Sequence, residues 1–185
     1  MRSFGCHRDH AIIAAPCRYC DRTLLLLLRT FLDVIALKKG PEHVPASRLL
    51  LAISTAFLLL ALFVATRMVG QAFGVNLAIE ALGLGLYVLV LVVTGYSRRL
   101  VPVLTTLLGC SGVLTLALGV ELVSFASLLG QDPALLIGIL IRFWSVFVEG
   151  HIMSRAMSRH LFAGVAVAIA AFTLRYAFQL HATRG

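Results

Sequence analysis

Five long apolar runs, separated by short polar links, constrain the fold of this chain more than any other feature. Each run approaches the roughly 20 residues that an α-helix needs to cross the hydrocarbon core of a bilayer. Backbone amides and carbonyls in hydrocarbon must pair within their own segment, so these runs are expected to be helical. The chain has 185 residues, 60% of them hydrophobic, and a soluble domain of this size has too little interior for so much apolar surface. The sequence therefore predicts an all-α integral membrane protein.

The transmembrane domain is expected to occupy residues 49–180 as a bundle of about five helices. The predicted spans are about 49–69, 77–96, 101–128, 134–154 and 161–180, followed by a tail at 181–185.

Residues 23–48 precede this domain as an amphipathic helix and a Pro-rich link. The helical part, residues 23–39, is apolar but interrupted by Arg29 and Asp33. A short segment with charge in its middle fits a helix that lies in the membrane interface. A sixth span is the alternative.

The third run, Pro102 to Leu128, carries small or polar residues on two opposite helical faces. One face holds Thr105, Gly109, Gly112 and Gly119, and the other holds Cys110, Ala117, Glu121 and Ser124. Small residues let helix backbones approach closely in lipid, so this pattern predicts a central helix with a neighbour on each side. The alternative is that Gly and Ser are simply frequent in membrane helices.

Residues 1–22 form a polar leader that bears Cys and His and is expected to be disordered. Cys17 and Cys20 form a CxxC pair that could share a metal ion, with Cys6 and His10 completing a zinc site. No second CxxC follows at zinc-ribbon spacing, so we expect no bound metal and no cofactor.

Lys and Arg alternate regularly between the two ends of the expected helices. Eight precede Leu49, two stand at Arg98 and Arg99, two at Arg155 and Arg159, and none lies in 70–76 or 129–133. The positive-inside rule then predicts a cytoplasmic N-terminus and an external C-terminus. The chain has a formal charge of +8, but its basic residues do not form the patch interleaved with aromatic residues that is typical of nucleic-acid-binding proteins. The expected partners are therefore the lipid bilayer and other membrane proteins.

Ionisable residues inside the spans are expected to pair. Arg67 and Glu80 lie almost symmetrically about one turn, and Glu121 and Arg142 about another. Equal helical rise then gives equal depth, so we predict two interhelical ion pairs, Arg67–Glu80 and Glu121–Arg142.

A second set of polar residues, Glu149, Ser145 and Arg175, could form a polar path. Glu149 also lies within reach of the basic residues at Arg98, Arg99 and Arg155. We interpret the intramembrane charges as pairs that fix helix register, with an ion or proton path as the alternative.

No arrangement of catalytic residues is recognisable. The sequence contains no HExxH, GxSxG or phosphate-binding loop. We therefore predict a non-enzymatic scaffold or interaction partner of other membrane proteins, or of further copies of itself. The alternative is a small transporter or ion-conducting protein that uses the intramembrane Glu and Arg residues.

Two stretches, Leu27 to Ser47 and Trp144 to Ile169, carry a resemblance to a known family. Together with the five spans, they resemble the Yip family of Ypt/Rab-interacting membrane proteins and the bacterial inner-membrane proteins similar to it. The resemblance implies a scaffold or trafficking role and a location in a bacterial inner membrane, and it supplies no catalytic residue.

Overall fold

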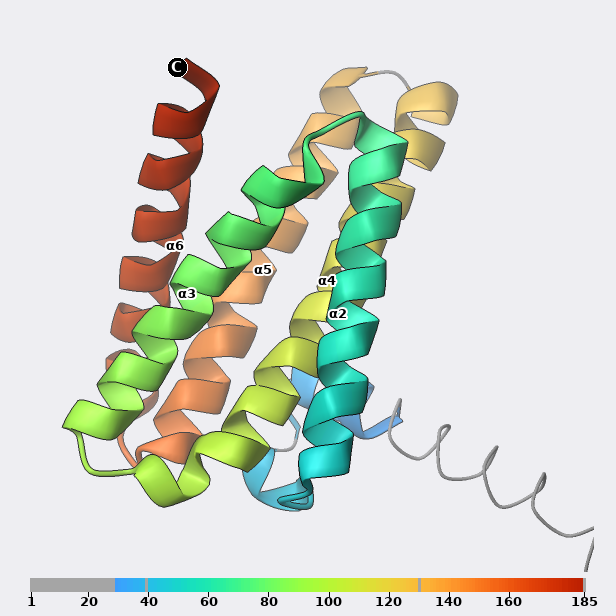
Figure 1. Ribbon diagram of the computed structural model, residues 1–185. Helices are drawn as coiled ribbons and strands as arrows, with labels where there is room; N and C mark the ends of the chain where they lie inside the picture. Colours follow the sequence, from blue (N-terminus) through green and yellow to red (C-terminus); the bar gives the residue numbers. More distant parts are fainter. Residues whose placement is uncertain (1–28, 39, 130, 185) are drawn as a thin grey trace, which may run out of the picture.

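The computed structural model describes residues 29–38, 40–129 and 131–184. In this part of the chain, five helices are long and apolar enough to cross a membrane, which confirms the predicted all-α fold (Figure 1). The elements are η1 (Pro41–His43), α2 (Arg48–Val69), α3 (Phe73–Val93), η2 (Ser97–Arg99), α4 (Leu100–Leu129), α5 (Gln131–Ala156) and α6 (Leu161–Arg184). The leader lies outside the described residues, and so do its candidate ligands Cys6, His10, Cys17 and Cys20.

Local signals account for the helix ends. The Ser47 side chain accepts a hydrogen bond from the Leu50 amide at 3.4 Å and caps the start of α2. Gly70, at φ 71°, ends α2, and Gly95, at φ 84°, follows the end of α3. α3 begins at Phe73, before the expected residue 77, and its N-cap residue Ala72 makes no side-chain capping hydrogen bond.

α4 is the most buried of the five spans, and it packs on α2 through one face and on α5 through the other. A Cβ atom on Gly112 would lie 2.7 Å from the Phe57 ring of α2, and one on Gly119 would lie 3.3 Å from the Cβ of Ala65. On the other face, a Cβ on Gly138 of α5 would lie 3.2 Å from the Glu121 carboxylate. The predicted packing of this helix on two sides is confirmed, and most of its small residues face this chain's own elements.

α3 leaves α2 after their turn and crosses toward α6 (Figure 1). We refer to the two ends of the bundle as the Gly70 end, with the α2–α3 and α4–α5 turns, and the Arg99 end, with η2 and the α5–α6 turn. α2 packs chiefly on α4, whereas α3 packs chiefly on α6. α2 and α6 therefore pack mainly on different helices.

An apolar core fills the half of the bundle near the Arg99 end. It includes Leu91, Leu107, Ile152 and Met153, all at most 1% exposed. The helical residues 29–35 close this core, because Phe31 packs against Gly109 of α4 and the Trp144 indole donates to the Ile35 carbonyl at 3.2 Å. The apolar face of the short N-terminal helix is thus turned onto α4 and α5.

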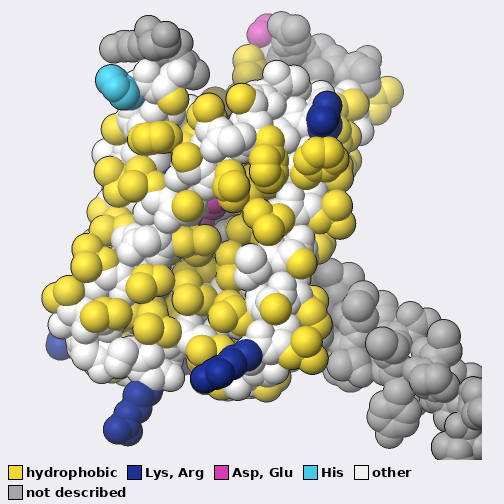
Figure 2. All heavy atoms as spheres, viewed as in Figure 1, with side chains coloured by type: hydrophobic (Ala, Val, Ile, Leu, Met, Phe, Trp, Pro, Cys, Tyr) yellow, Lys and Arg dark blue, Asp and Glu magenta, His cyan; other side chains and the backbone are white. Residues whose placement is uncertain are grey.

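Apolar side chains dominate the outer surface, as embedding in a bilayer requires. Figure 2 shows them covering most of one face of the bundle, with Lys and Arg mainly at its lower edge. Residues such as Leu49, Leu136, Ile139 and Phe162 are exposed by 67% or more. Five apolar spans with this surface support a polytopic protein embedded in lipid.

Candidate functional site: a charged cluster beside a polar cavity

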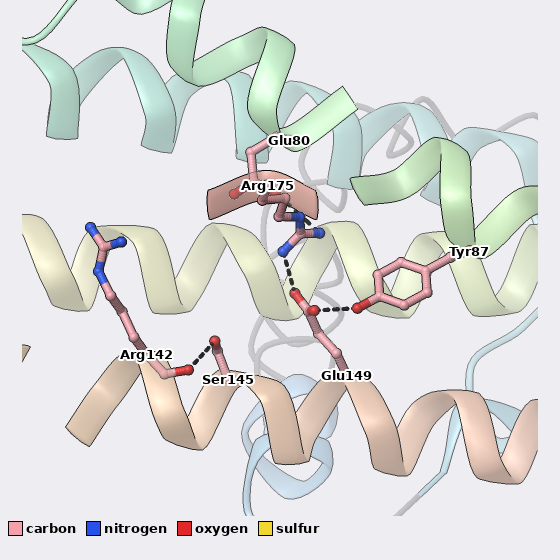
Figure 3. Close-up of polar contacts among 6 residues, drawn as sticks. All are labelled: Glu80, Tyr87, Arg142, Ser145, Glu149 and Arg175. Carbon is pink, nitrogen blue, oxygen red and sulfur yellow. Dashed lines mark hydrogen bonds and ion pairs between the residues drawn. The ribbon is translucent and has the colours of Figure 1, made fainter. Parts of the chain in front are cut away.

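One guanidinium lies between two carboxylates in the middle of the bundle. Arg175 of α6 donates through Nη1 to Glu149 Oε1 of α5 at 2.9 Å, and its Nη2 lies 3.6 Å from Glu80 Oε2 of α3. The Tyr87 hydroxyl of α3 donates to the other oxygen of Glu149 (Figure 3). We call Glu80, Tyr87, Glu149 and Arg175 the Arg175 cluster, and it joins three helices.

The sequence of α3 explains why these groups converge. Glu80, Gly83 and Tyr87 recur at positions i, i+3 and i+7, so all three lie on one face of the helix. Because Gly83 has no side chain, the Arg175 guanidinium lies directly against the α3 backbone, and a Cβ there would overlap it. The guanidinium carbon also lies 5.8 Å from the centre of the Tyr87 ring, within cation–π distance.

The cluster is strongly desolvated but incompletely hydrogen-bonded. The Arg175 and Glu149 side chains are 13% and 8% exposed, and Glu80 is 20% exposed. Among the described residues, Arg175 Nε, Arg175 Nη2 and Glu80 Oε2 are buried without a hydrogen-bond partner. Buried polar atoms normally find partners, and here Nη2 and Oε2 have only their ion-pair contact at 3.6 Å.

A cavity of about 190 Å³ lies against the cluster. Its lining includes Gln71, Asn76 and Gln179 at the Gly70 end of the bundle and reaches Glu80, Glu149 and Arg175 in the middle. The face drawn in Figure 2 has a recess in which acidic atoms are visible among apolar side chains. The cavity therefore extends from the Gly70 end toward the cluster, and the apolar core closes it on the far side.

Arg142 and Ser145 of α5 also line this cavity. Figure 3 shows both on the same side of α5 as Glu149. The Ser145 hydroxyl donates to the carbonyl of Arg142 at 2.6 Å, whereas the Arg142 guanidinium has no ion pair within the described residues. Thr66, Ser111 and Thr115 add hydroxyl groups to the wall. The expected polar set of Glu149, Ser145 and Arg175 is thus brought to one cavity.

The predicted Arg67–Glu80 pair is not formed. Arg67 is exposed, and its guanidinium lies 5.2 Å from the centre of the Phe63 ring on its own helix. Glu80 instead faces Arg175. Equal distance from a turn fixes depth but not direction, and because α3 packs on α6 rather than on α2, Glu80 is turned away from Arg67.

The predicted Glu121–Arg142 pair is also not formed. Both carboxylate oxygens of Glu121 are buried without a hydrogen-bond partner in the part of the chain that the structure describes, and the side chain packs against Gly138. Arg142 lies one helical turn further along α5, where it is exposed and lines the cavity. The α5 residue that lies against the Glu121 carboxylate is therefore Gly138, which carries no charge, and not Arg142.

Glu149 pairs with neither Arg98, Arg99 nor Arg155, but with Arg175. Sequence reasoning missed Tyr87 and Gly83. The regular spacing of Glu80, Gly83 and Tyr87 in an otherwise apolar run was the signal that could have found them, because it marks a face of α3 that approaches another polar group.

These features define a polytopic α-helical membrane protein with a charged cluster at the base of an intramembrane cavity. Comparisons with protein-family models, curated proteins and solved structures find no match to this chain.

Proposed function

We propose that the protein is a small transporter that binds a small polar solute in the cavity beside the Arg175 cluster. The observation that carries the proposal is that Glu and Arg side chains from three helices line a cavity within the bundle. Charge within a membrane span is costly and is by default associated with a substrate or ion path.

A purely structural role accounts for only part of this arrangement. The Glu149–Arg175 ion pair holds α5 and α6 together, and such a pair needs no cavity. Arg142 and the hydroxyl groups on the wall stabilise no helix contact of that kind. A concave site with a few converging polar groups is the usual form of a small-molecule site, which favours solute binding.

The lining indicates the chemistry of the solute. Arg142 offers a guanidinium for an anionic group, and Glu80 offers a carboxylate for a cationic group. The volume of about 190 Å³ is below the roughly 300–1,000 Å³ of drug-sized pockets. These properties fit a small solute that carries both charges, or a small organic anion.

Uptake into proteoliposomes tests the proposal. Wild-type protein should accumulate labelled zwitterionic or anionic solutes above the level of empty liposomes, and Arg142→Gln should remove most of that uptake. Arg67→Gln is the matched control, because Arg67 is exposed near the same end of the bundle but is not part of the cavity lining. Uptake no greater than in empty liposomes across such a solute panel, or equal losses in the two variants, would reject the proposal.

A non-enzymatic interaction role is the second candidate, and it is supported by one surface of α6. Small residues recur there at intervals of three and four on an exposed stripe: Ala163, Ala166, Ala170, Thr173 and Ala177. α6 is also the least buried span. Small residues at this spacing permit close helix contact in lipid. The resemblance to the Yip family implies the same kind of role and is likewise a proposal.

Energy transfer between labelled copies in liposomes distinguishes this candidate. Association through α6 predicts a signal that survives dilution with lipid and is lost in Ala166→Leu/Ala170→Leu. Ile169→Leu, at an exposed position on the same helix, should keep the signal. If the wild-type energy-transfer signal is no higher than that of membrane proteins that do not associate, the hypothesis of self-association would be rejected.

The orientation and compartment are part of the proposal. The basic residues Lys38, Arg48, Arg99 and Arg155 lie toward the Arg99 end of the bundle. The positive-inside rule favours a cytoplasmic Arg99 end. The cavity would then extend from the external side of a bacterial inner membrane.

A further inference from the structure

A second cavity, of about 760 Å³, lies at the Arg99 end of the bundle. It is bordered by η1, the start of α4, the end of α5 and the start of α6. Its charged or ionisable lining residues are Glu42, Arg99, His151, Arg155 and Arg159. Three guanidiniums therefore face one carboxylate, and the lining is basic.

Arg99 builds one wall of this pocket. Its Nη1 donates to the carbonyl of Ala156 at 3.0 Å and to the Ser158 hydroxyl at 2.9 Å. These bonds satisfy the end of α5 and hold the α5–α6 turn, in which Ser158 adopts φ 50°. Arg99 is thus engaged by the protein and shapes the pocket.

Arg155 and Arg159 are in a different situation. Both are exposed and line the pocket, and neither makes a side-chain ion pair within the described ranges 29–38, 40–129 and 131–184. They leave two guanidiniums available to a ligand. Guanidinium groups bind phosphate oxygens through paired hydrogen bonds, so the available chemistry is that of a phosphate site.

Two further groups favour an anion in this pocket. The Nε2 atom of His151 is buried and has no hydrogen-bond partner among the described residues, and His151 is a lining residue. α6 also begins at Leu161 on the pocket edge, and the amides of a helix N-terminus favour a negative group. These features lie on different elements from Arg99 and support the same ligand class independently.

The surroundings indicate where the phosphate comes from. Leu161 on the pocket edge is 46% exposed, and the adjacent Phe162 is 86% exposed. An exposed apolar edge beside a basic pocket suits a molecule with acyl chains attached to a phosphate. We propose that this pocket binds the phosphate headgroup of an anionic phospholipid, with the acyl chains running along the start of α6. Basic pockets between membrane helices are known to suit such headgroups.

Lipid titration of the detergent-purified full chain, followed by native mass spectrometry, tests the proposal. Phosphatidylglycerol should bind more tightly than phosphatidylcholine with the same acyl chains. Arg155→Gln/Arg159→Gln should weaken phosphatidylglycerol binding by roughly fivefold for each lost charge. Arg48→Gln/Arg98→Gln is the matched control, because it removes two exposed arginines near the same end that do not line the pocket.

A second variant tests the same site if the double arginine variant does not fold. Leu161→Glu places a carboxylate at the pocket edge, and an acidic residue in the first turn of a helix is compatible with helix stability. It should repel the phosphate and weaken phosphatidylglycerol binding while the protein keeps its thermal stability. Unchanged binding in Leu161→Glu would contradict the proposed location.

Three other results would overturn the proposal. One is equal binding of the two lipids by the wild type. Another is an equal loss in the two double variants, which would indicate general attraction to basic ends. The third is displacement of the lipid by millimolar inorganic phosphate, which would assign the pocket to a soluble phosphate compound.

Discussion

Gly83 of α3 and Arg175 of α6 lie in direct contact, with the guanidinium packed on the backbone of the glycine. The same guanidinium donates to Glu149 at 2.9 Å, so its position is set from two sides. A side chain at residue 83 would compete with that hydrogen bond. The contact therefore links a packing requirement on α3 to the electrostatics of the cavity.

Gly83→Ala should lower thermal stability in detergent, because its methyl group must displace Arg175 from Glu149. We expect a cost of about 2 kcal/mol or more, combining overpacking with a disrupted buried ion pair. Gly85→Ala is the matched control on the same helix, because a Cβ there meets nothing within 4 Å. Its effect should be neutral or up to about 1 kcal/mol stabilising, from helix propensity.

The same pair provides an internal test. In an Arg175→Ala background the space beside Gly83 is empty, so adding Gly83→Ala should cost little. An equal cost in both backgrounds would mean that the glycine matters for a reason other than Arg175.

Arg175 and Glu149 should be coupled energetically. Arg175→Met leaves two buried carboxylates without their cation, and Glu149→Met removes the strongest partner of Arg175. Each single change should destabilise by about 3–5 kcal/mol, which is typical of breaking a buried pair. The double variant should lose less than the sum of the two, as measured by unfolding in detergent. Strict additivity would show that the ion pair contributes no coupling.

Removing the Glu121 carboxylate should not destabilise the protein, in contrast to removing Glu149 or Arg175. Its carboxylate is buried against Gly138 and makes no hydrogen bond to any residue that the structure describes, so removing it releases a group whose burial is uncompensated. Glu121→Met should leave stability unchanged or raise it. Its effect should add to that of Arg142→Leu, since the two side chains do not pair. A marked loss of stability, or clear coupling to Arg142, would show that the predicted pair forms in the membrane after all.

Glu80 and Glu121 show how far the sequence determines the fold and the site. Hydropathy located all five spans because the length of a run and its lack of charge suffice for that purpose. The depth of Glu80 and Glu121 follows equally well from counting residues along a helix. Their partners do not follow, since a partner depends on which helices become neighbours and on how far each is rotated.

The choice of neighbours was set by residues that carry no charge. Gly112 and Gly119 bring α4 to α2, and α3 is thereby left to pack on α6. Glu80 then meets Arg175, which is 95 positions away by residue number, instead of Arg67 across the nearest turn. An ion pair between residues so far apart in the sequence leaves no local pattern. The polar face of α3, by contrast, is visible in the sequence as the spacing of Glu80, Gly83 and Tyr87.

The closest approach between α5 and α6 gives the last prediction. Gly150 and Gly164 face each other, and a Cβ on Gly164 would overlap the carbonyl oxygen of Gly150. A Cβ on Gly150 would lie 2.8 Å from the Cα of Val165. Both obstacles are backbone atoms, which no change of rotamer can move, so the two helices would have to separate. Close contact through small residues is a main source of helix association in lipid.

Gly164→Ala should therefore destabilise the protein by about 1–3 kcal/mol despite the better helix propensity of Ala. It should also weaken binding in the cavity, because Arg175 and Glu149 reach each other across the same helix pair. Gly74→Ala, with nothing within 4 Å of its Cβ, is the control for a glycine replaced in a helix. Thermal unfolding in detergent measures the first effect and solute uptake the second. Wild-type stability in Gly164→Ala would mean that α5 and α6 are further apart in the membrane than their glycines indicate.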